Sequence, residues 1–424
     1  MKDLKNNINI PSNWDYLSLE KIANTTSGGT PNRSITSYFT NGTIPWIKTG
    51  ELKRKYITDV EEYITEEALS KSSAKLVESN SLVLAMYGAT IGNLSILNFS
   101  ASTNQACCVI TPYINATIDE FLYYYFTFIK NDIIQLGAGG AQPNISQQII
   151  KKIKVLLPPL KEQQRIADIL STVDEQIENT EQLIEKIKEL KKGLMQRLLT
   201  KGIGHTKFKQ TEIGEIPEEW EVILLEEGLE LLTDYTANGS FAALKENVVY
   251  YRDPNYALLV RTTDLQKNSF NSGNIYIDEH AYKFLSKSSL YGGELIMNNV
   301  GAGAGQVFLM PFLNRKASIA PNALVFKFKK KYLNEYFYYY FQSYVGKSAL
   351  KKLSPTGALK SINKTMLKSI KLAIPTLDEQ KNIVEIIKSI DNQIEAYDQE
   401  KMKYNELKKG LMQQLLTGKI RVSV

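Results

Sequence analysis

Two long segments of the chain carry apolar residues at alternating spacings of three and four, as in a helix with one buried stripe. In the first segment these positions are Ile166, Leu170, Val173, Ile177, Ile184, Ile187, Leu194 and Leu198. In the second segment they are Ile383, Ile387, Ile390, Ile394, Tyr397, Tyr404, Leu411 and Leu415. Both stripes continue for more than four heptads, which predicts two long coiled-coil helices.

The ends of both predicted helices carry start and stop signals. Pro158-Pro159 and Pro375 precede the stripes, and Gly202 and Gly418 follow them. Proline suits the entrance of a helix and glycine suits its exit. Polar residues that interrupt the stripes are interpreted as fixing partner and register; they are Thr180, Lys191, Lys401 and Lys408.

The two helical segments are copies of each other. "KKGLMQRLLTKGI" at 191–203 returns as "KKGLMQQLLTGKI" at 408–420, and a shift of 217 residues aligns this part of the chain without a gap. Upstream the match is weaker, but "GATIG" at 88–92 still corresponds to "GAGAG" at 301–305. Each half is therefore a variable globular domain followed by a nearly constant helix, because copies of one fold diverge most in their loops.

Segment lengths favour antiparallel packing of the two helices. About 41 residues at 1.5 Å each form a rod of roughly 60 Å. The connection from Lys201 to about Glu215 reaches only about 50 Å when fully extended, which is too short for a parallel pair. Antiparallel packing would place the globular domains at opposite ends of the rod, related by an approximate twofold axis.

The globular segments mix strand-like runs, such as "SLVLAMYG" and "QACCVITPYI", with helical runs such as "DEFLYYYFTFI". The predicted fold class is α/β (α+β), with two globular domains per chain, two long antiparallel coiled-coil helices and a pseudo-twofold internal repeat. The predicted parts are a first domain at 1–157, a first helix at 158–200, a linker at 201–215, a second domain at 216–374, and a second helix with tail at 375–424.

Composition and motifs narrow the class of protein. No run of about eighteen apolar residues and no secretion signal occurs, so we expect a cytoplasmic protein. Cys107 and Cys108 are adjacent in an apolar run and are expected in the core, while His205 and His280 are far apart, so no metal site is expected. No Walker motif or NPPF-like tetrapeptide occurs, and "GAGAG" precedes a strand-like run where a dinucleotide fold needs a helix. No catalytic residue is predicted.

Positive charge is concentrated in the second half. Residues 315–371 contain thirteen Lys or Arg and a single acid, Glu335. A folded segment this basic favours a polyanionic partner. A basic surface that is merely solvated remains the alternative on charge alone.

In their order and duplication, the motifs resemble the specificity subunits of type I restriction-modification systems. The resemblance covers almost the whole chain and rests on "IPWIKTGEL", "GATIGN", "STNQACCVI", "PPLKEQQRIADIL" and "LKKGLMQRLL", followed by "IPTLDEQKNIVEII" and "LKKGLMQQLL". It implies two target recognition domains, each reading one half of a bipartite, asymmetric site in double-stranded DNA. It also implies helices that set the spacer and dock two methyltransferase (modification) subunits, with restriction/translocase subunits joining for cleavage. "KKGLMQ" would then occur twice because one kind of partner is seated twice.

The same resemblance implies a non-catalytic specificity subunit with no cofactor of its own. S-adenosylmethionine, ATP and Mg are expected on the partner subunits, where the methyltransferase flips the target adenine. Two alternatives from other classes remain open. One is a DNA methyltransferase with a fused recognition domain, and the other is a protein scaffold that does not touch DNA.

Polar, glycine-containing loops supply the candidate DNA contacts. Lysines suit phosphates, whereas Arg33, Arg261, Thr262, Asn298 and Asn299 have the chemistry to read base edges. The full set of predicted DNA-binding residues is Thr30, Arg33, Lys48, Thr49, Lys53, Arg54, Lys55, Arg261, Thr262, Thr263, Asp264, Asn298, Asn299, Lys351, Lys352, Lys360 and Lys364.

Overall fold

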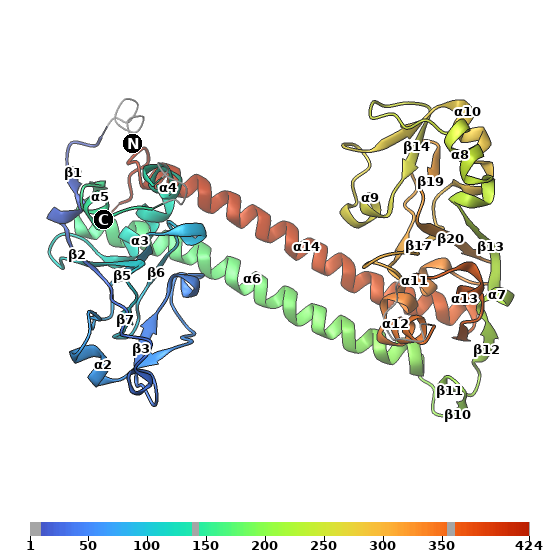
Figure 1. The fold of residues 1–424 in the computed structure, drawn as a ribbon, viewed down its shortest axis with the longest axis horizontal. Helices are drawn as coiled ribbons and strands as arrows, with labels where there is room; N and C mark the ends of the chain where they lie inside the picture. The colour runs from blue at the N-terminus through green and yellow to red at the C-terminus, as the bar shows by residue number, and fades with distance from the viewer. Residues whose placement is uncertain (1–9, 138–143, 354–360, 424) are drawn as a thin grey trace. The chain divides into compact units, whose positions relative to one another are not determined.

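A computed structural model describes residues 10–137, 144–353 and 361–423. The chain divides into two compact units. Unit 1 comprises Met1–Gln182 and Asp398–Val424, and unit 2 comprises Leu183–Tyr397. Each unit contains a globular domain together with part of both long helices, α6 (Leu160–Lys201) and α14 (Leu377–Leu415) (Figure 1).

Unit 1 is organised around an antiparallel four-stranded sheet in the order β2-β8-β5-β6. Its strands are β2 (Ala23–Ser27), β8 (Cys107–Pro112), β5 (Leu82–Ala85) and β6 (Leu94–Ile96). The two strand-like runs predicted in this domain are thus β5 and β8, and Cys107 and Cys108 are buried in β8 as expected. Smaller sheets are formed by β4 (Tyr63–Ile64), β3 (Ile44–Ile47) and β7 (Ser102–Thr103), and by β1 (Asp15–Ser18) with β9 (Lys154–Leu157).

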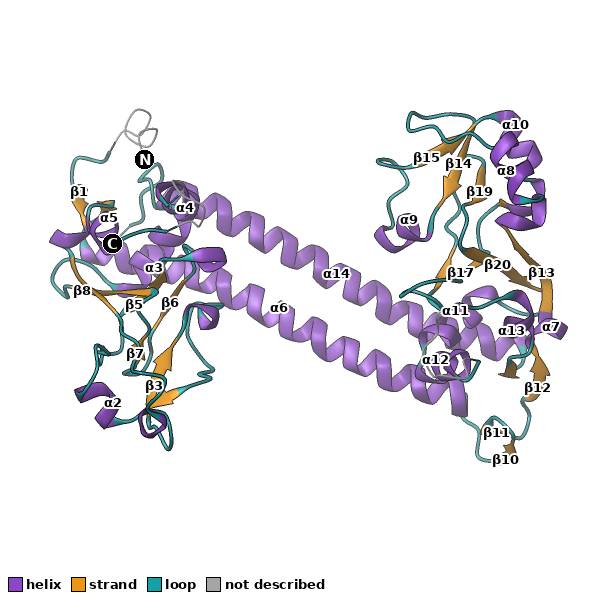
Figure 2. Cartoon of the chain, in the orientation of Figure 1, coloured by secondary structure: helices purple, strands orange, loops and turns teal. Residues whose placement is uncertain are grey.

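Short helices complete this domain (Figure 2). They are α2 (Glu66–Ser70), α3 (Asp119–Phe128), α4 (Lys130–Leu136) and α5 (Gln147–Lys151), with single 3-10 turns η1 (Leu19–Lys21), η2 (Thr36–Tyr38), η3 (Thr49–Glu51) and η4 (Gly88–Thr90). The aromatic run predicted as a helix is α3, whose Phe121 and Tyr125 are buried in the core. Ile166 of α6 and Leu415 of α14 belong to the same core cluster, so both long helices contribute to the fold of unit 1.

Unit 2 repeats this architecture and confirms the internal duplication. A four-stranded sheet in the order β13-β20-β17-β18 corresponds to β2-β8-β5-β6, and a sheet in the order β15-β14-β19-β16 contains a parallel pair, β14 and β19, as β3 and β7 do. The strands are β12 (Glu221–Leu224), β13 (Leu229–Asp234), β14 (Ala257–Val260), β15 (Ile275–Ile277), β16 (Ser289–Leu290), β17 (Leu295–Asn298), β18 (Val307–Leu309), β19 (Ala317–Ile319), β20 (Ala323–Phe328) and β21 (Lys371–Ile374). Strand β18 begins one residue after "GAGAG", separated from it by Gln306, which confirms the predicted strand at the position where a dinucleotide fold needs a helix.

Short helices also complete unit 2. They are α7 (Leu225–Gly228), α8 (Phe241–Asn247), α9 (Thr262–Lys267), α10 (Glu279–Phe284), α11 (Asn334–Gln342), α12 (Tyr344–Lys351) and α13 (Lys364–Lys368), with η5 (Tyr235–Asn238) and η6 (Ser286–Ser288). A hairpin of β10 (Phe208–Thr211) and β11 (Gly214–Pro217) follows α6. The candidate contacts Arg261 to Asp264, expected on a polar loop, instead begin α9, because the Asp264 carboxylate accepts a hydrogen bond from the Arg261 backbone N–H and closes the first turn.

The predicted helix ends are close to the observed ones. α6 begins directly after Pro158-Pro159, and Gly202 and Gly418 adopt positive φ angles of 64° and 70° just beyond the two helices. Glycine adopts this left-handed backbone without the strain that a Cβ would cause. No helix among the described residues is both long enough and apolar enough to span a membrane.

Candidate functional site

Inside unit 1, a lysine of α14 closes the helix pair by reaching an aspartate of α6. Lys408 Nζ lies 2.5 Å from Asp174 Oδ1, and the hydroxyl of Tyr124 on α3 donates to Asp174 Oδ2 over 2.7 Å. The side chains of Lys408 and Asp174 are only 20% and 23% exposed. The first lysine of the second "KKGLMQ" copy therefore ties together α6, α14 and the globular domain.

Unit 2 contains the repeat equivalent of this lysine–aspartate–tyrosine triad. Lys191 of α6 pairs with Asp391 of α14, and the Tyr339 hydroxyl on α11 donates to Asp391 Oδ2 over 2.9 Å. Burial and the adjacent carboxylate raise the pKa of Tyr339, so the phenol stays a proton donor. The duplicated motif thus has an intramolecular use, because each copy supplies the lysine that the other copy's aspartate needs.

The direction of the helix pair follows from two ion pairs in unit 1. Asp174 pairs with Lys408, and seven residues further along α6, Glu181 approaches Lys401 at 3.7 Å, seven residues earlier on α14. Moving forward along α6 therefore means moving backward along α14, so the two helices pack antiparallel, as predicted. Lysines inside the stripe thereby fix the register of the two helices. The Thr180 hydroxyl, also inside the stripe, donates a hydrogen bond of 2.7 Å to the backbone carbonyl of Gln176.

A second polar cluster fastens the start of α6. The side chain of Glu162 is 1% exposed and accepts two hydrogen bonds of 2.7 Å from Arg421 and one of 3.0 Å from Trp14 Nε1. Burial alone would raise the pKa of Glu162, but the hydrogen bonds from Arg421 and Trp14 together hold this pKa below its ordinary value. Residues beyond the C-terminal end of α14 are therefore built into unit 1.

The start of α14 in unit 2 has an equivalent cluster with different chemistry. Glu379 accepts a hydrogen bond from Trp220 Nε1 at 3.0 Å and lies 2.9 Å from His205 Nε2. The backbone N–H of Ile203 also donates to Glu379 over 2.9 Å. A Cβ on Gly202 would come within 2.3 Å of the Glu379 carboxylate, so the glycine permits the chain to turn back onto this carboxylate.

Several predicted DNA-binding residues of the first domain lie together. Arg33 stacks on the rings of Phe39 and Trp46 at 4.7 and 4.8 Å and contacts Glu62 at 2.6 Å. Lys48 reaches the same Glu62 at 3.0 Å. The hydrogen bond from Arg33 holds the pKa of Glu62 below its ordinary range. The Arg33 side chain is still 53% exposed, so it is held in place and remains accessible to a ligand.

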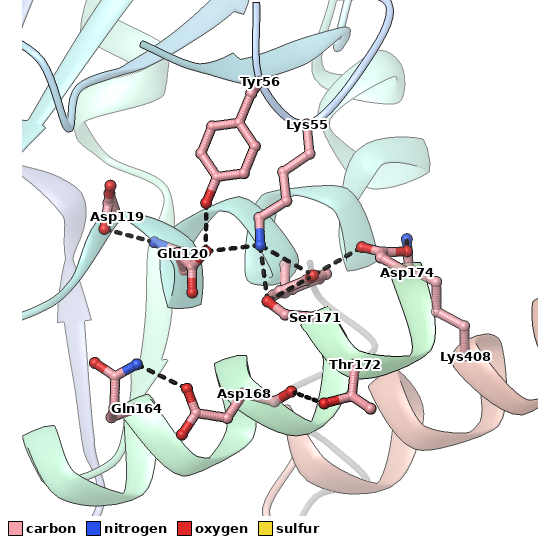
Figure 3. Close-up of polar contacts among 11 residues, drawn as sticks. Lys55, Tyr56, Asp119, Glu120, Gln164, Asp168, Ser171, Thr172, Asp174 and Lys408 are labelled. Carbon is pink, nitrogen blue, oxygen red and sulfur yellow. Dashed lines mark hydrogen bonds and ion pairs between the residues drawn. The ribbon is translucent and has the colours of Figure 1, made fainter. Parts of the chain in front are cut away.

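The other first-domain candidates lie on nearby exposed segments, with one exception. Thr49 begins η3, and Lys53 and Arg54 are exposed after it. Lys55 points the other way, toward Glu120 at 2.7 Å and Ser171 Oγ of α6 at 2.8 Å, with its side chain 15% exposed (Figure 3). In this structure the ammonium of Lys55 joins the loop to α3 and α6, and its predicted contact with DNA stays a prediction.

In the second domain, Arg261 is oriented by Asp264. The guanidinium contacts the carboxylate at 2.6 and 3.0 Å and donates to the Gly273 carbonyl over 2.8 Å. Asp264 is buried at 5% exposure; in this structure it positions Arg261 and caps α9, and its predicted contact with DNA stays a prediction. Thr262 and Thr263 occupy the first turn of α9, and Thr263 is exposed.

The remaining second-domain candidates are spread over three elements. Asn298 ends β17, and Asn299 has a buried Oδ1 with no hydrogen-bond partner among the described residues. Lys351 and Lys352 are exposed at the end of α12, and Lys364 of α13 lies 2.9 Å from Asp234 with its side chain 35% exposed. Lys360 lies outside the described residues.

Sequence reasoning missed two residues beside these candidates. The Thr30 hydroxyl donates to Oε1 of Gln105, an exposed amide of the kind that can pair with an adenine edge. The Ser27 hydroxyl donates to Oε1 of Gln147 over 3.1 Å. Gln147 is the repeat equivalent of the candidate Lys364, since the two are 217 positions apart, and Lys364 contacts Asp234 in unit 2. The repeat shift could have identified Gln147; no sequence signal identified Gln105.

Comparisons with known proteins agree with this architecture. A family model described as the type I restriction modification DNA specificity domain matches residues 11–189 and 217–408. The type I restriction enzyme MjaVIII specificity subunit of Methanocaldococcus jannaschii is 27% identical over 421 residues, covering 98% of this chain and 95% of that protein.

Solved structures show the same fold. The S subunit of a type I restriction-modification system from M. genitalium superposes with a TM-score of 0.54 and 15% identity, covering 97% of this chain and 96% of that one. A chain from a study of complex assembly and conformational transition of the type I R-M system gives a TM-score of 0.62 and 16% identity, covering 97% and 99%.

Proposed function

The chain belongs to the type I restriction modification DNA specificity family, and from that premise we propose that it is the subunit that selects the DNA sequence. Each globular domain reads one half of a bipartite, asymmetric site in double-stranded DNA. The chain itself supplies recognition and not chemistry, and it works in the cytoplasm, where the DNA is accessible.

The observation that carries the proposal is the reciprocal pairing of the two copies. Lys408 of the second copy pairs with Asp174 of the first, and Lys191 of the first pairs with Asp391 of the second. Such pairing supports a role in which two recognition domains of one fold keep a fixed register. We propose that the helices set the spacer between the half-sites in this way.

The recognition surface in each domain combines fixed cations and exposed amides. Arg33, held by Phe39, Trp46 and Glu62, is suited to base edges because a pre-oriented guanidinium loses little freedom on binding. Arg261, held by Asp264, has the same character in the second domain. Lys351 and Lys352 are exposed and suit phosphates.

Two modification subunits and, for restriction, translocase subunits complete the proposed complex. S-adenosylmethionine, ATP and Mg belong to those subunits in this proposal. The rival interpretation, a methyltransferase with its own recognition domain, requires S-adenosylmethionine binding by this chain alone.

The proposal is tested by assembling the full chain with the modification subunit of its host. We expect the assembled complex to shift a DNA fragment that carries the site, and genome-wide mapping to find methylated adenines that disappear when this gene is deleted. A chain that cross-links labelled S-adenosylmethionine without its partners would contradict the proposal. So would a methylation pattern that the deletion leaves unchanged.

A further inference from the structure

Unit 2 contains a cavity that the shared fold of the two copies does not require. Its volume is about 480 Å³, within the range of small-molecule sites in proteins. The walls are the end of β13, the turn η5, the helix α8 and the segments that follow β17 and precede β20. The lining residues with aromatic or unused polar side chains are Tyr235, Phe241, Lys245, Tyr250, Asn299 and Asn322.

In unit 1 the matching place is filled. The strand registers give Ser27 of β2 and Asp234 of β13 the same position in the two copies, so Tyr235 stands where unit 1 has Gly28. A Cβ on Gly28 would clash with the Thr103 hydroxyl. Unit 1 also has no α-helix between β2 and β3, a stretch that the structure describes in full. The cavity therefore belongs to the second domain and has a use that the two copies do not share.

Three aromatic side chains line the cavity. Phe241, the first residue of α8, is 82% exposed, and Tyr250 is 51% exposed. The Tyr250 hydroxyl donates to the hydroxyl of the buried Tyr235 over 3.4 Å, which holds the Tyr250 ring at the cavity. Exposed rings that share one cavity offer a planar ligand a surface on which to stack.

The unused polar groups of the cavity indicate what else the ligand carries. Asn299 has a buried Oδ1 without a partner in the described part of the chain. The side chains of Asn322 and Lys245 are exposed and form no hydrogen bond or ion pair with a described residue. Asp234 is already occupied, because its carboxylate pairs with Lys364. Two amides and one cation thus remain for a ligand.

A nucleotide has the groups that complement this set. Its base is planar and stacks on aromatic rings. Amide side chains suit the base edge, which presents both hydrogen-bond donors and acceptors. Its phosphate is negatively charged and suits a lysine ammonium.

We propose that the cavity of unit 2 binds one nucleotide. The base lies against Phe241 and Tyr250, its edge meets the amides of Asn299 and Asn322, and the phosphate meets Lys245. A nucleotide with this chemistry has two sources, since it is either free in solution or extruded from a double helix. Only the second source rests on the proposed function, because it requires DNA at this domain.

The first arm of the test uses the full chain alone and the four deoxynucleoside 5′-monophosphates, with affinity measured by ligand-observed NMR titration. We expect saturable binding that Phe241→Ala weakens by about fivefold or more, because stacking of the base is lost. Lys245→Met should weaken binding of the nucleotide and leave binding of the corresponding nucleoside unchanged, because only the nucleotide carries a phosphate.

The second arm uses the complex with the modification subunit of its host and a DNA fragment that carries the mapped site. Permanganate modifies unstacked thymines, and chloroacetaldehyde modifies unpaired adenines and cytosines, so together they report a base that has left the helix. We expect a reactive base in one half-site that Phe241→Ala abolishes. A base extruded by the methyltransferase would stay reactive in this variant, which separates the two events.

Phe312→Ala is the matched control for both arms. Phe312 is 81% exposed, as Phe241 is 82% exposed, and it lies outside the cavity. The control should leave nucleotide affinity and base reactivity unchanged. Circular dichroism of Phe241→Ala should match that of the unmodified chain, because the lost ring is exposed.

Free-nucleotide binding that depends on Phe241 would assign the cavity to a soluble nucleotide, and a reactive base that depends on Phe241 would assign it to DNA. The absence of both effects would overturn the inference and leave the proposed function standing. Nucleotide binding that neither Phe241→Ala nor Lys245→Met changes would also overturn it. A complex that binds no DNA would refute the proposed function, and the first arm alone would then decide the inference.

Discussion

At the scale of single residues, the partly buried polar groups that join the long helices to the globular domains are sites where the loss of one charge should lower the stability of the fold. Asp174 receives both a lysine and a tyrosine hydroxyl, so removal of the lysine leaves a carboxylate with one partner in a partly buried position. Hydrogen bonds to charged groups stabilise more than neutral ones, and partial exposure moderates the effect.

Lys408→Met should lower the free energy of unfolding by about 1–2 kcal/mol, because it removes the charge but keeps most of the apolar stem. Lys409→Met is the matched control, since Lys409 is exposed and forms no ion pair with the described residues. Urea denaturation measures both. Equal stability of the two variants would contradict a structural role for the lysine–aspartate–tyrosine triad.

Glu162 should make the stability of unit 1 sensitive to acid. Its folded pKa lies below its ordinary value, so the carboxylate stabilises the fold at any pH above the unfolded pKa. This stabilisation is lost as the pH falls through the folded pKa. Glu162→Gln should be less stable than the unmodified chain at pH 7 and lose less stability on acidification.

Thermal unfolding from pH 7 down to pH 3 measures this difference, with Glu175→Gln as the control for an exposed glutamate of α6. If Glu162→Gln loses stability as steeply as the unmodified chain, the low pKa of Glu162 is not a source of the acid sensitivity.

Replacing Lys351 and Lys352 by alanine should weaken DNA binding to all sequences alike, because both lysines are assigned to phosphates. The slope of log K against log salt should fall by about 2, close to 0.9 per phosphate contact. Lys283→Ala, at an exposed lysine paired with Glu279, is the control. A change in the preferred bases would show that the pair reads sequence.

At the scale of elements, hydrophobic periodicity was sufficient to predict both long helices and the strands β5 and β8. These signals are strong because nearly every buried position of a long helix stripe or of a core strand must be apolar. Helix α9 was missed since its start depends on one side chain, Asp264, and propensity gives no warning of such a cap. Short elements are decided by tertiary contacts that local sequence does not contain.

The site was predicted less completely than the fold for a related reason. Lys55 was assigned to DNA from its place in a basic run, but its ammonium is directed to Glu120 and Ser171. Only the three-dimensional path of the loop decides this direction. Arg33 and Lys48 do come together at Glu62, although their predicted contact with DNA stays a prediction.

Inserting one heptad into each long helix, at matched positions, should lengthen the tolerated spacer by about three base pairs. Seven residues extend a helix by about 10.5 Å, and each base pair of B-form DNA takes about 3.4 Å. A heptad also preserves the facing of the buried stripe. Methylation mapping should find unchanged half-site bases.

The matched control is a five-residue insertion, which rotates the following stripe by about 140° and should destabilise the helix pair. Changed half-site bases in the heptad variant would contradict the division of labour between helices and domains.

At the scale of the whole molecule, the two copies share a fold but differ in the polar residues at matching positions. Ser27 and Gln147 meet in unit 1 where Asp234 and Lys364 meet in unit 2. A common frame with different polar groups is what an asymmetric two-part target requires.

Arg33→Ala and Arg261→Ala should therefore relax sequence preference in different halves of the target. Each bidentate arginine contact is worth about 1–3 kcal/mol of discrimination, so relaxation of roughly ten-fold or more is expected at one position. Binding selections with randomised half-sites measure this effect. Altered preference in both halves from one substitution would show that the two domains do not read independently.

The hydrogen bonds from Arg421 to Glu162 and the packing of Leu415 and Leu416 into the core of unit 1 have a consequence for synthesis on the ribosome. Most domains can close as soon as they emerge, in order from the N-terminus. Here the first segment of unit 1 must wait for its second segment, which is made after the whole of unit 2, whereas unit 2 is contiguous and can close sooner. During translation the first recognition domain therefore stays open longest and depends most on protection from aggregation.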